Sequence, residues 1–284
     1  MELRGVTHVY SRGTPFEKTA LNNVSLTVEK GEFLGLIGHT GSGKSTLVQH
    51  MNALLRPDKG TVLLDGEDIF ASKAAMRAAR FRVGLVFQYP EHQLFEETLR
   101  ADIAFGPKNM GLRGDELEER VAEAAAFCEL KPALLDRSPL ELSGGQKRRA
   151  AIAGILAMRP ELLILDEPGA GLDPRARETI LRRLDDWRRA TGAAVVLVTH
   201  DMSAAASLCG RLAVLRSGEL FAQGTPREIF TRTAELESMG LDLPPAARIA
   251  EKLRALGVAV PAGLYTPEEL AEALLRLRKE GTPC

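Results

Sequence analysis

The sequence predicts an α/β fold with a mainly parallel central sheet, and three observations lead to this prediction. Short apolar runs, such as residues 33–37 and 162–165, have the length of buried strands. Stretches with helical spacing of apolar residues lie between several of these runs, as expected when parallel strands are joined by helices. A glycine-rich segment at 38–45 directly follows one strand-like run, which is where ligands bind in open α/β sheets.

The expected strands can be placed along the chain. Residues 24–28 alternate between apolar and polar side chains, residues 30–32 form a turn, and residues 33–37 form a buried run. Further strands are expected at 61–64, 82–87, 162–165, 194–198 and 212–215.

Two helices have recognisable starts and apolar faces. Asp115 is expected to cap the first, whose stripe consists of Leu117, Val121, Ala124 and Cys128. In the second, Asp173 is the expected cap before a first-turn proline, and the apolar face is made of Ile180, Leu184 and Trp187. Both faces are interpreted as core.

The character of the chain changes after about residue 231. Pro244 and Pro245 introduce an expected helix with Ile249, Leu253 and Leu256. A second helix is expected to start at residues 266–269 and to carry three leucines, Leu270, Leu274 and Leu277. The prediction is an ATPase-sized domain at 1–231 followed by a helical extension at 232–284.

Composition excludes several classes of protein. The net charge of -1 and pI near 6.6 give no bulk basic field for nucleic acid or an anionic membrane surface, although local patches remain possible, so the charge says little about partners. The apolar runs are far shorter than the roughly 20 residues that cross a bilayer, and the start of the chain lacks the apolar core of a signal peptide. Membrane association is therefore expected only through another protein. Cys128, Cys209 and Cys284 are widely spaced, which argues against a disulfide framework or a zinc site and favours buried thiols in a reducing compartment.

The glycine-rich segment matches the phosphate-loop pattern and precedes a helix-like stretch at 46–52. Its glycines allow backbone N–H groups to face phosphates, Lys44 can reach the β and γ phosphates, and the Ser45 hydroxyl can bind Mg²⁺. The residues expected to surround ATP are Gly38, His39, Thr40, Gly41, Ser42, Gly43, Lys44, Ser45 and Thr46, and no chemistry is expected of His39.

Two carboxylates follow the apolar run 162–165, at the carboxyl end of the expected strand. Asp166 is the expected Mg²⁺ carboxylate, and Glu167 is placed to orient and deprotonate the attacking water. Alone, such a pair could be an ordinary solvated loop. Together with the phosphate loop it favours phosphoryl transfer from ATP.

A second possible anion site lies at 142–146, with the sequence Leu-Ser-Gly-Gly-Gln before a helix-like run. Ser143 is placed to cap this helix, and the two glycines permit close approach of another molecule. The candidate residues of this second anion site are Ser143, Gly144, Gly145 and Gln146. On this string, the phosphate loop and the carboxylate pair, residues 1–230 resemble the ABC ATPases.

The resemblance implies further roles. In that family the signature string of one chain closes on ATP held by a facing chain, so two chains enclose two ATP molecules. The matching positions here imply that Tyr10 stacks on adenine, Gln88 senses Mg²⁺ and water, Asp173 contacts the other subunit, and His200 is the γ-phosphate switch. Lys44, Gln88, Glu167 and His200 form the expected catalytic set, Ser45, Gln88 and Asp166 the expected metal set, and the implied cofactors are ATP and Mg²⁺.

Alternatives remain open for three of these positions. Tyr10 could be only a strand aromatic, with Phe16 as a rival for adenine. Gln88 could be an exposed strand end, and His200 a satisfied histidine at a strand terminus. The implied fold is a P-loop ATPase with a parallel core sheet, an antiparallel β subdomain, a helical signature subdomain at about 89–158 and a small helical C-terminal extension.

The resemblance narrows the choice within the family. DNA-acting members insert a long coiled coil between phosphate loop and signature, translation-linked members usually carry two ATPase domains, and P-loop kinases or GTPases lack the signature; none of these fits. Residues 13–18, 88–95, 102–109 and 146–149 and the tail instead resemble the second A-component ATPase of energy-coupling factor (ECF) transporters.

That finer resemblance implies partners and a location. They are a second, non-identical ABC ATPase, with a homodimer possible in isolation, a transmembrane T component and substrate-binding S components, and no nucleic acid is expected among them. The assembly would import vitamins or transition-metal ions, with this chain bound peripherally at the cytoplasmic face of the cell membrane. Residues 88–95 would face the coupling helices of the T component, although they could instead pack into the helical subdomain.

Overall fold

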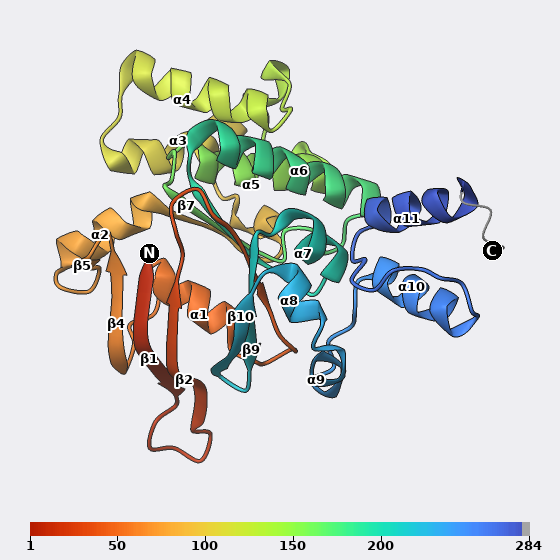
Figure 1. Ribbon diagram of the computed structural model, residues 1–284. Coiled ribbons are helices and arrows are strands. Elements are labelled where there is room, and N and C mark those ends of the chain that lie inside the picture. Colours follow the sequence, from red (N-terminus) through yellow and green to blue (C-terminus); the bar gives the residue numbers. More distant parts are fainter. Residues whose placement is uncertain (280–284) are drawn as a thin grey trace.

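A six-stranded sheet with strand order β10-β9-β3-β8-β7-β6 forms the centre of the molecule (Figure 1). The computed structural model describes residues 1–279. β6, β7, β8, β3 and β9 are parallel, and β10 joins as an antiparallel edge strand. The strands are β3 (Phe33–Ile37), β6 (Val83–Val86), β7 (Leu162–Asp166), β8 (Ala194–Val198), β9 (Arg211–Arg216) and β10 (Glu219–Gly224).

A smaller antiparallel sheet of order β2-β1-β4-β5 lies against one face of the central sheet. It consists of β1 (Glu2–Tyr10), β2 (Lys18–Thr27), β4 (Lys59–Leu64) and β5 (Glu67–Asp68), and helix α1 (Lys44–Met51) contributes Leu47 and Met51 to the same core cluster. Alternate residues of β7 enter opposite cores: Ile164 faces this cluster, and Leu163 faces the helices on the other side. Burial on both faces explains why the central strands are continuous apolar runs.

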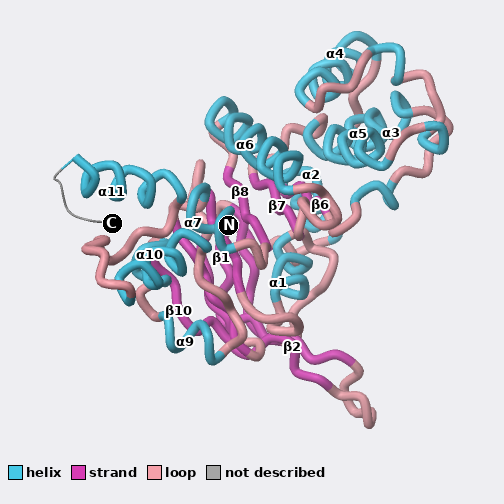
Figure 2. Tube along the Cα trace, turned by 90° about the vertical axis from the view of Figure 1, so that its right-hand side faces the viewer, coloured by secondary structure: helices cyan, strands magenta, loops and turns pink. Residues whose placement is uncertain are grey.

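The remaining helices form three groups. A helical cluster stands apart from the sheet in Figure 2 and comprises α3 (Leu99–Met110), α4 (Gly114–Phe127) and α5 (Gly144–Leu156). The second group lies beside the sheets and consists of α2 (Lys73–Arg82), α6 (Pro174–Thr191), α7 (Met202–Leu208) and α8 (Pro226–Phe230). The third group is the tail, with α9 (Thr233–Ser238), α10 (Pro245–Ala255) and α11 (Pro267–Lys279). Short 3-10 helices occupy Pro90–Gln93 (η1), Pro132–Leu134 (η2) and Pro139–Glu141 (η3).

The predicted fold class is confirmed, with its parallel core sheet, antiparallel β sheet, helical cluster and helical tail. Each strand that the sequence predicts overlaps a strand of the structure, and those at 33–37 and 194–198 have the same bounds. The sequence analysis did not predict β1, β5 and β10. Strand β10 lies at the sheet edge with partly exposed side chains, so it lacks the continuous apolar run that marks the central strands.

Two expectations about helices need correction. Helix α4 begins at Gly114 with Arg113 at the cap position and no side-chain capping bond, so the prediction that Asp115 caps it is wrong. Asp115 lies in the first turn, where its charge favours the positive end of the helix dipole. In α10, Ile249 is 49% exposed and Leu256 is 80% exposed. This helix instead buries small residues, which are Ala246, Ala247 and Ala250.

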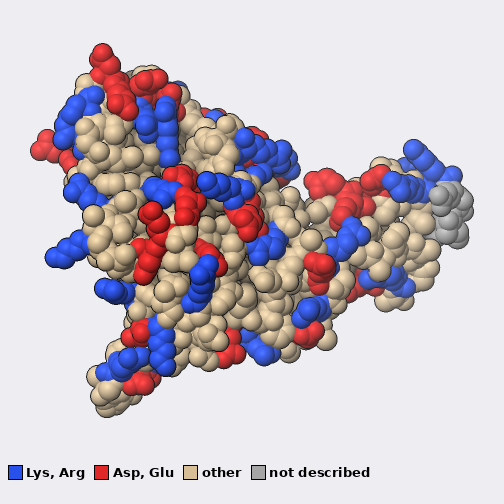
Figure 3. All heavy atoms as spheres, turned by 60° about the vertical axis from the view of Figure 1, so that its left-hand side comes forward, with Lys and Arg blue, Asp and Glu red and all other residues tan. Residues whose placement is uncertain are grey.

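The other predicted helix features agree with the structure. Leu117, Val121, Ala124 and Cys128 are buried around α4, as are Leu184 and Trp187 of α6. Cys128 and Cys209 are buried free thiols, whereas Cys284 lies outside the described residues. Among the helices described over residues 1–279, none combines the length and apolarity needed to cross a bilayer. On the face shown in Figure 3, acidic and basic side chains are intermingled.

Candidate functional site

The phosphate loop passes from β3 into α1 with a backbone that requires glycine. Gly43 has φ 106°, and a Cβ there would stand 2.6 Å from the Ala20 carbonyl oxygen. The Lys44 ammonium donates to the carbonyl oxygens of Gly38 at 2.7 Å and His39 at 3.0 Å, so it lies inside the curve of the loop. Burial lowers the pKa of Lys44, and the nearby carboxylates oppose this shift. The arrangement provides a positive charge and inward-facing backbone for phosphates.

Asp166 ends β7 beside the start of α1. Its side chain is buried, and burial raises the pKa of this carboxyl, while a hydrogen bond from the Ser45 hydroxyl lowers it. A carboxylate and a hydroxyl next to a phosphate loop fit the ligand preference of Mg²⁺, which binds one or two protein oxygens and completes its shell with phosphates and water. The predicted metal residues Ser45 and Asp166 are therefore adjacent, and their chemistry fits the ion.

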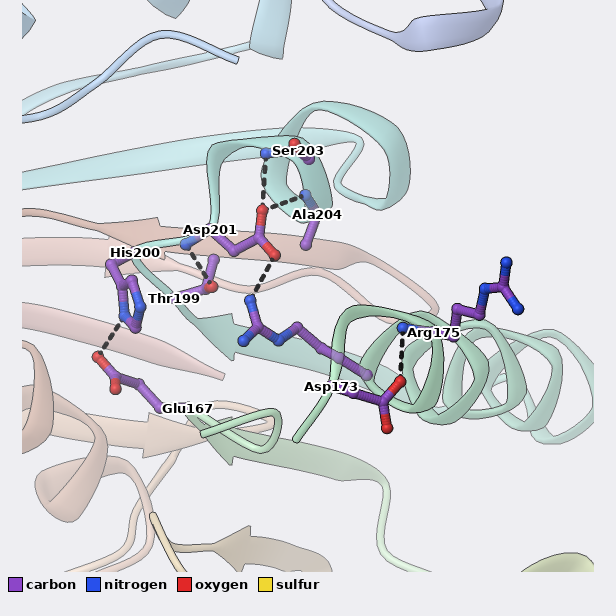
Figure 4. Close-up of polar contacts among 9 residues, drawn as sticks. Glu167, Asp173, Arg175, Thr199, His200, Asp201, Ser203 and Ala204 are labelled. Carbon is purple, nitrogen blue, oxygen red and sulfur yellow. Dashed lines mark hydrogen bonds and ion pairs between the residues drawn. The ribbon is translucent and has the colours of Figure 1, made fainter. Parts of the chain in front are cut away.

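Glu167 lies between the two other polar residues that the sequence assigned to this edge. Gln88 Nε2 donates to Glu167 Oε2 at 3.1 Å. Glu167 Oε1 lies 3.1 Å from Nδ1 of His200, as Figure 4 shows. The Glu167 backbone has φ 50° and donates its N–H to the Val198 carbonyl at 3.0 Å. These contacts fix the carboxylate at the carboxyl edge of β7 and β8, beside a cavity of about 240 Å³. Three residues far apart in sequence thus meet around one carboxylate.

Two aspartates next to this edge cap helices. Asp173 accepts from the backbone N–H groups of Arg175 and Ala176, and it is the predicted cap of α6. Asp201 accepts from the N–H groups of Ser203 and Ala204 at the start of α7 (Figure 4). Because both caps are made within the chain, the positions of the loops after Glu167 and His200 are fixed by the helices that follow them.

The adenine side of the loop contains Tyr10. Its hydroxyl lies 3.2 Å from Thr46 Oγ1, and both line a cavity of about 170 Å³ with Lys18 and the phosphate loop. Phe16, its rival, is 83% exposed in the loop between β1 and β2. The edge of the His8 ring packs against Tyr10 with 4.6 Å between ring centroids. Tyr10 is therefore the aromatic residue next to the phosphate loop.

The signature segment begins α5 as predicted. Ser143 accepts from the Gln146 N–H, and the Gln146 side chain accepts from the Ser143 N–H, which forms a reciprocal capping box. Gly144 and Gly145 are exposed and do not have positive φ. No described atom lies within 4 Å of a Cβ placed at either glycine. Nothing in the described part of the chain therefore requires glycine at these two positions.

Sequence reasoning missed four residues near these segments. Lys18 lines the adenine-side cavity, Arg177 pairs with Asp201 at 3.0 Å, Asp102 caps the turn at residues 95–96, and Arg148 is buried behind the signature. Charged residues in a run such as 146–149 usually lie on a solvated face, so only the three-dimensional fold distinguishes Arg148 from its neighbours.

Comparisons with known proteins identify the family. Residues 21–170 match the family model described as ABC transporter. An energy-coupling factor transporter ATP-binding protein EcfA2 of Symbiobacterium thermophilum is 54% identical over 269 residues, which cover 95% of this chain and 93% of that protein. The EcfA2 of Caldanaerobacter subterraneus is 47% identical over 97% of this chain and 96% of that protein.

Two solved structures extend the comparison. The cbiO1 protein of Clostridium perfringens, described as part of the ABC transporter complex cbiONQ, has 35% identity and a TM-score of 0.74, covering 88% of this chain and 98% of its own. The ATP-binding cassette MJ0796, a dimer with ADP and Pi, has 31% identity and a TM-score of 0.71, covering 79% of this chain and 98% of its own. By sequence and fold, this chain belongs to the ABC transporter ATP-binding proteins and, within them, to the energy-coupling factor group.

Proposed function

We propose that this chain binds ATP with Mg²⁺ and hydrolyses it as one of two ATPase subunits that power an energy-coupling factor importer. The observation that carries the proposal is the position of Glu167 between Gln88 and His200, at the sheet edge that also holds the phosphate loop. A carboxylate oriented by two polar partners beside phosphate-binding groups suits activation of water for attack on the γ phosphate.

The residues of this chain divide the chemical work. Lys44 and the loop N–H groups bind the phosphates, and Tyr10 stacks on adenine. Glu167 takes the proton of the attacking water, while Gln88 and His200 hold the carboxylate and report whether a γ phosphate is present. Ser45, Asp166 and Gln88 would hold Mg²⁺, which would neutralise charge on the phosphates.

The signature segment supports a site completed by a second chain. Gly144 and Gly145 are exposed, and within the described residues nothing competes for the space beside them. Glycines that the fold does not require are explained if another molecule must approach the backbone closely. We infer that Ser143, Gly144 and Gly145 contact ATP on the facing ATPase, and that the Asp173 loop lies at the same interface.

A groove beside η1 supports docking of a membrane subunit. Its cavity of about 260 Å³ is lined by Leu94, Phe95 and Phe105, and the two phenylalanine rings lie 4.8 Å apart. Phe95 is 66% exposed. At the same groove Asp102 accepts from the N–H groups of residues 95 and 96, and its second carboxylate oxygen is buried without a partner among the described residues. Arg80 also lines the groove, but its guanidinium donates to the Ala53 carbonyl. A largely apolar groove with one unpaired carboxylate oxygen fits a short helix that carries an arginine or lysine.

We therefore propose a transmembrane T component as the occupant of this groove. The further partners are a second, non-identical ATPase and substrate-binding S components, and the imported substrates are vitamins or transition-metal ions. The proposed location is the cytoplasmic face of the cell membrane, where the chain is held by the T component. The domain boundary at residues 231 and 232 belongs to the same proposal, in which the tail forms a second contact between the ATPases.

Copurification tests this function. The chain is tagged, expressed in its own cells and isolated from gently solubilised membranes beside an Asp102→Asn variant. Recovery of an integral membrane protein, a different ABC ATPase and small hydrophobic binding proteins would support the proposal, and Asp102→Asn should recover less of the integral protein. Recovery of only a homodimer with two ordinary permease subunits would indicate a conventional importer, and recovery of nucleic acid or ribosomes without membrane proteins would contradict the transport function.

A further inference from the structure

A single buried arginine connects three segments to which the proposed function gives separate roles. Arg148 lies in the second turn of α5, directly behind the signature, and is 3% exposed. Its guanidinium forms a two-point contact with Glu91 of η1, with N···O distances of 3.1 and 2.9 Å. Its remaining terminal nitrogen donates to the Ala170 carbonyl at 2.8 Å.

The two contacts of Arg148 lie in two different loops beside Glu167, at the carboxyl edge of the sheet. Glu91 is three residues beyond Gln88, which donates to Glu167. Ala170 lies between Glu167 and Asp173, and its own N–H donates to the Glu167 carbonyl at 3.0 Å. Arg148 therefore joins the signature helix to the loops on both sides of the Glu167 carboxylate.

The contact is costly to form and difficult to replace. A buried charge is tolerated only when paired and hydrogen-bonded, and loss of one partner leaves the other charge uncompensated. Burial on its own would raise the pKa of Glu91, but the Arg148 guanidinium and a backbone N–H more than offset this and lower it. The planar fork of arginine reaches a carboxylate and a carbonyl together, whereas a lysine ammonium has no such fork.

We propose that Arg148 is a positioning residue that makes the signature helix move as one body with the loops carrying Gln88 and Asp173. The inference rests on the proposed function, because it requires the signature to act on ATP held by a facing chain. When ATP draws Gln88 and Glu167 into place, the Arg148 link turns α5 so that Ser143 and Gly145 face the partner's nucleotide. Loss of the link leaves ATP binding intact and impairs closure of the two chains.

Three variants test the link: Arg148→Lys keeps the charge, Arg148→Met removes it, and Glu91→Gln weakens the pair from the other side. The matched control is Arg159→Met, which breaks the Arg159–Glu123 pair at 2.5 Å between the loop after α5 and helix α4, where both side chains are about half exposed. Each is made in the chain as it purifies with its partner ATPase. The measurements are melting temperature, kcat and KM for ATP hydrolysis, and ATP-driven closure in a Glu167→Gln background.

The expected result is a split between binding and turnover. The kcat falls by about 10-fold in Arg148→Lys and further in Arg148→Met, while ATP affinity stays within about twofold, because coupling energies of this kind correspond to changes of that size. Closure with ATP weakens in the same order. Glu91→Gln reproduces much of the loss and adds little to Arg148→Met, since the two residues act as one unit. Arg159→Met leaves every readout unchanged.

Two results would overturn the inference. If the Arg148 and Glu91 variants retain wild-type kcat and closure, the link does not position the signature. If ATP affinity, kcat and melting temperature decline in parallel, the pair only stabilises the fold. Failure of the proposed function is recognised separately, because then Glu167→Gln itself would hydrolyse ATP at the wild-type rate.

Discussion

The phosphate loop and the signature segment are both rich in glycine, but the two regions need glycine for different reasons. In the phosphate loop a Cβ on Gly43 would clash with Ala20, and one on Gly38 would clash with Leu215. At the signature, Gly144 and Gly145 face open space within the described structure. The first segment is shaped by its own chain, whereas nothing in the described residues shapes the second. This difference supports the proposal that one ATP site is built from two chains.

The largest expected effect concerns Glu167, the proposed base for ATP hydrolysis. Glu167→Gln keeps the shape and the hydrogen bond from Gln88 but removes the base, so hydrolysis should fall by about 10³-fold while ATP still binds. Phosphate release and nucleotide binding, measured on the same preparation, provide the check. Normal turnover would show that another group activates the water.

Gly43→Ala tests the intramolecular half of the comparison. The positive φ and the close Ala20 oxygen should together cost about 3 kcal/mol of folding free energy, and phosphate binding should be lost as well. Urea unfolding monitored by circular dichroism measures the change. A stability equal to the wild type would mean that the loop adapts and that its glycine is not imposed by the fold.

His50 allows the stability of the helix that follows the phosphate loop to be tested through its pH dependence. Its ring is buried at the end of α1, its Nδ1 lies 2.8 Å from the Leu55 carbonyl, and burial lowers its pKa from 6.5 to about 4. The unfolded chain therefore takes up this proton at higher pH than the folded chain, so stability falls as pH drops from 6.5 towards 4.

The size of this pH dependence follows from the lowered pKa of His50. Between about pH 7.5 and about pH 5, protonation of His50 in the unfolded chain should cost about 2 kcal/mol, and His50→Gln should remove that share of the pH dependence. Urea unfolding at both pH values measures it. The control is His92→Gln, because His92 is exposed. An identical pH dependence in wild type and His50→Gln would contradict the assignment.

Gly145→Ala has the smallest expected effect on folding, and it tests the other part of the comparison, the proposed contact of the signature segment with a facing chain. Alanine in the first turn of α5 should raise stability by up to about 1 kcal/mol, because it lowers the backbone entropy of the unfolded chain. Hydrolysis by the paired ATPases should nevertheless fall, since the methyl group occupies space intended for the facing nucleotide. A loss of stability comparable to that of Gly43→Ala would remove the contrast between the two segments.

Much of the fold was predictable because its central strands are buried on both faces and appear as continuous apolar runs. The Asp173 and Ser143 caps were predictable because a short polar side chain before a helix has a local purpose. Edge strand β10 was not predicted, since its side chains are partly exposed. The buried face of α10 was missed because alanines, rather than the larger Ile249 and Leu256, make it.

For the candidate site, motif order placed the phosphate loop, the Asp166–Glu167 pair and the signature. The order of the motifs could not reveal contacts that are made by residues outside the motifs. Arg148 and Asp102 are charged residues in ordinary amphipathic stretches. Arg148 is buried where η1 packs against α5, and one carboxylate oxygen of Asp102 is buried where residues 95 and 96 contact α3. Sequence spacing alone contains no information about that packing.

The most direct test of a two-chain ATP site is the solution mass of the Glu167→Gln chain, purified with any second ATPase that accompanies it, measured by light scattering with and without ATP. We predict that ATP drives two ATPase chains into one stable particle, and that adding Gly145→Asp abolishes this pairing although ATP remains bound. If the chain binds ATP without pairing, or pairs equally well with Gly145→Asp, the signature does not complete a neighbouring site and the account is contradicted.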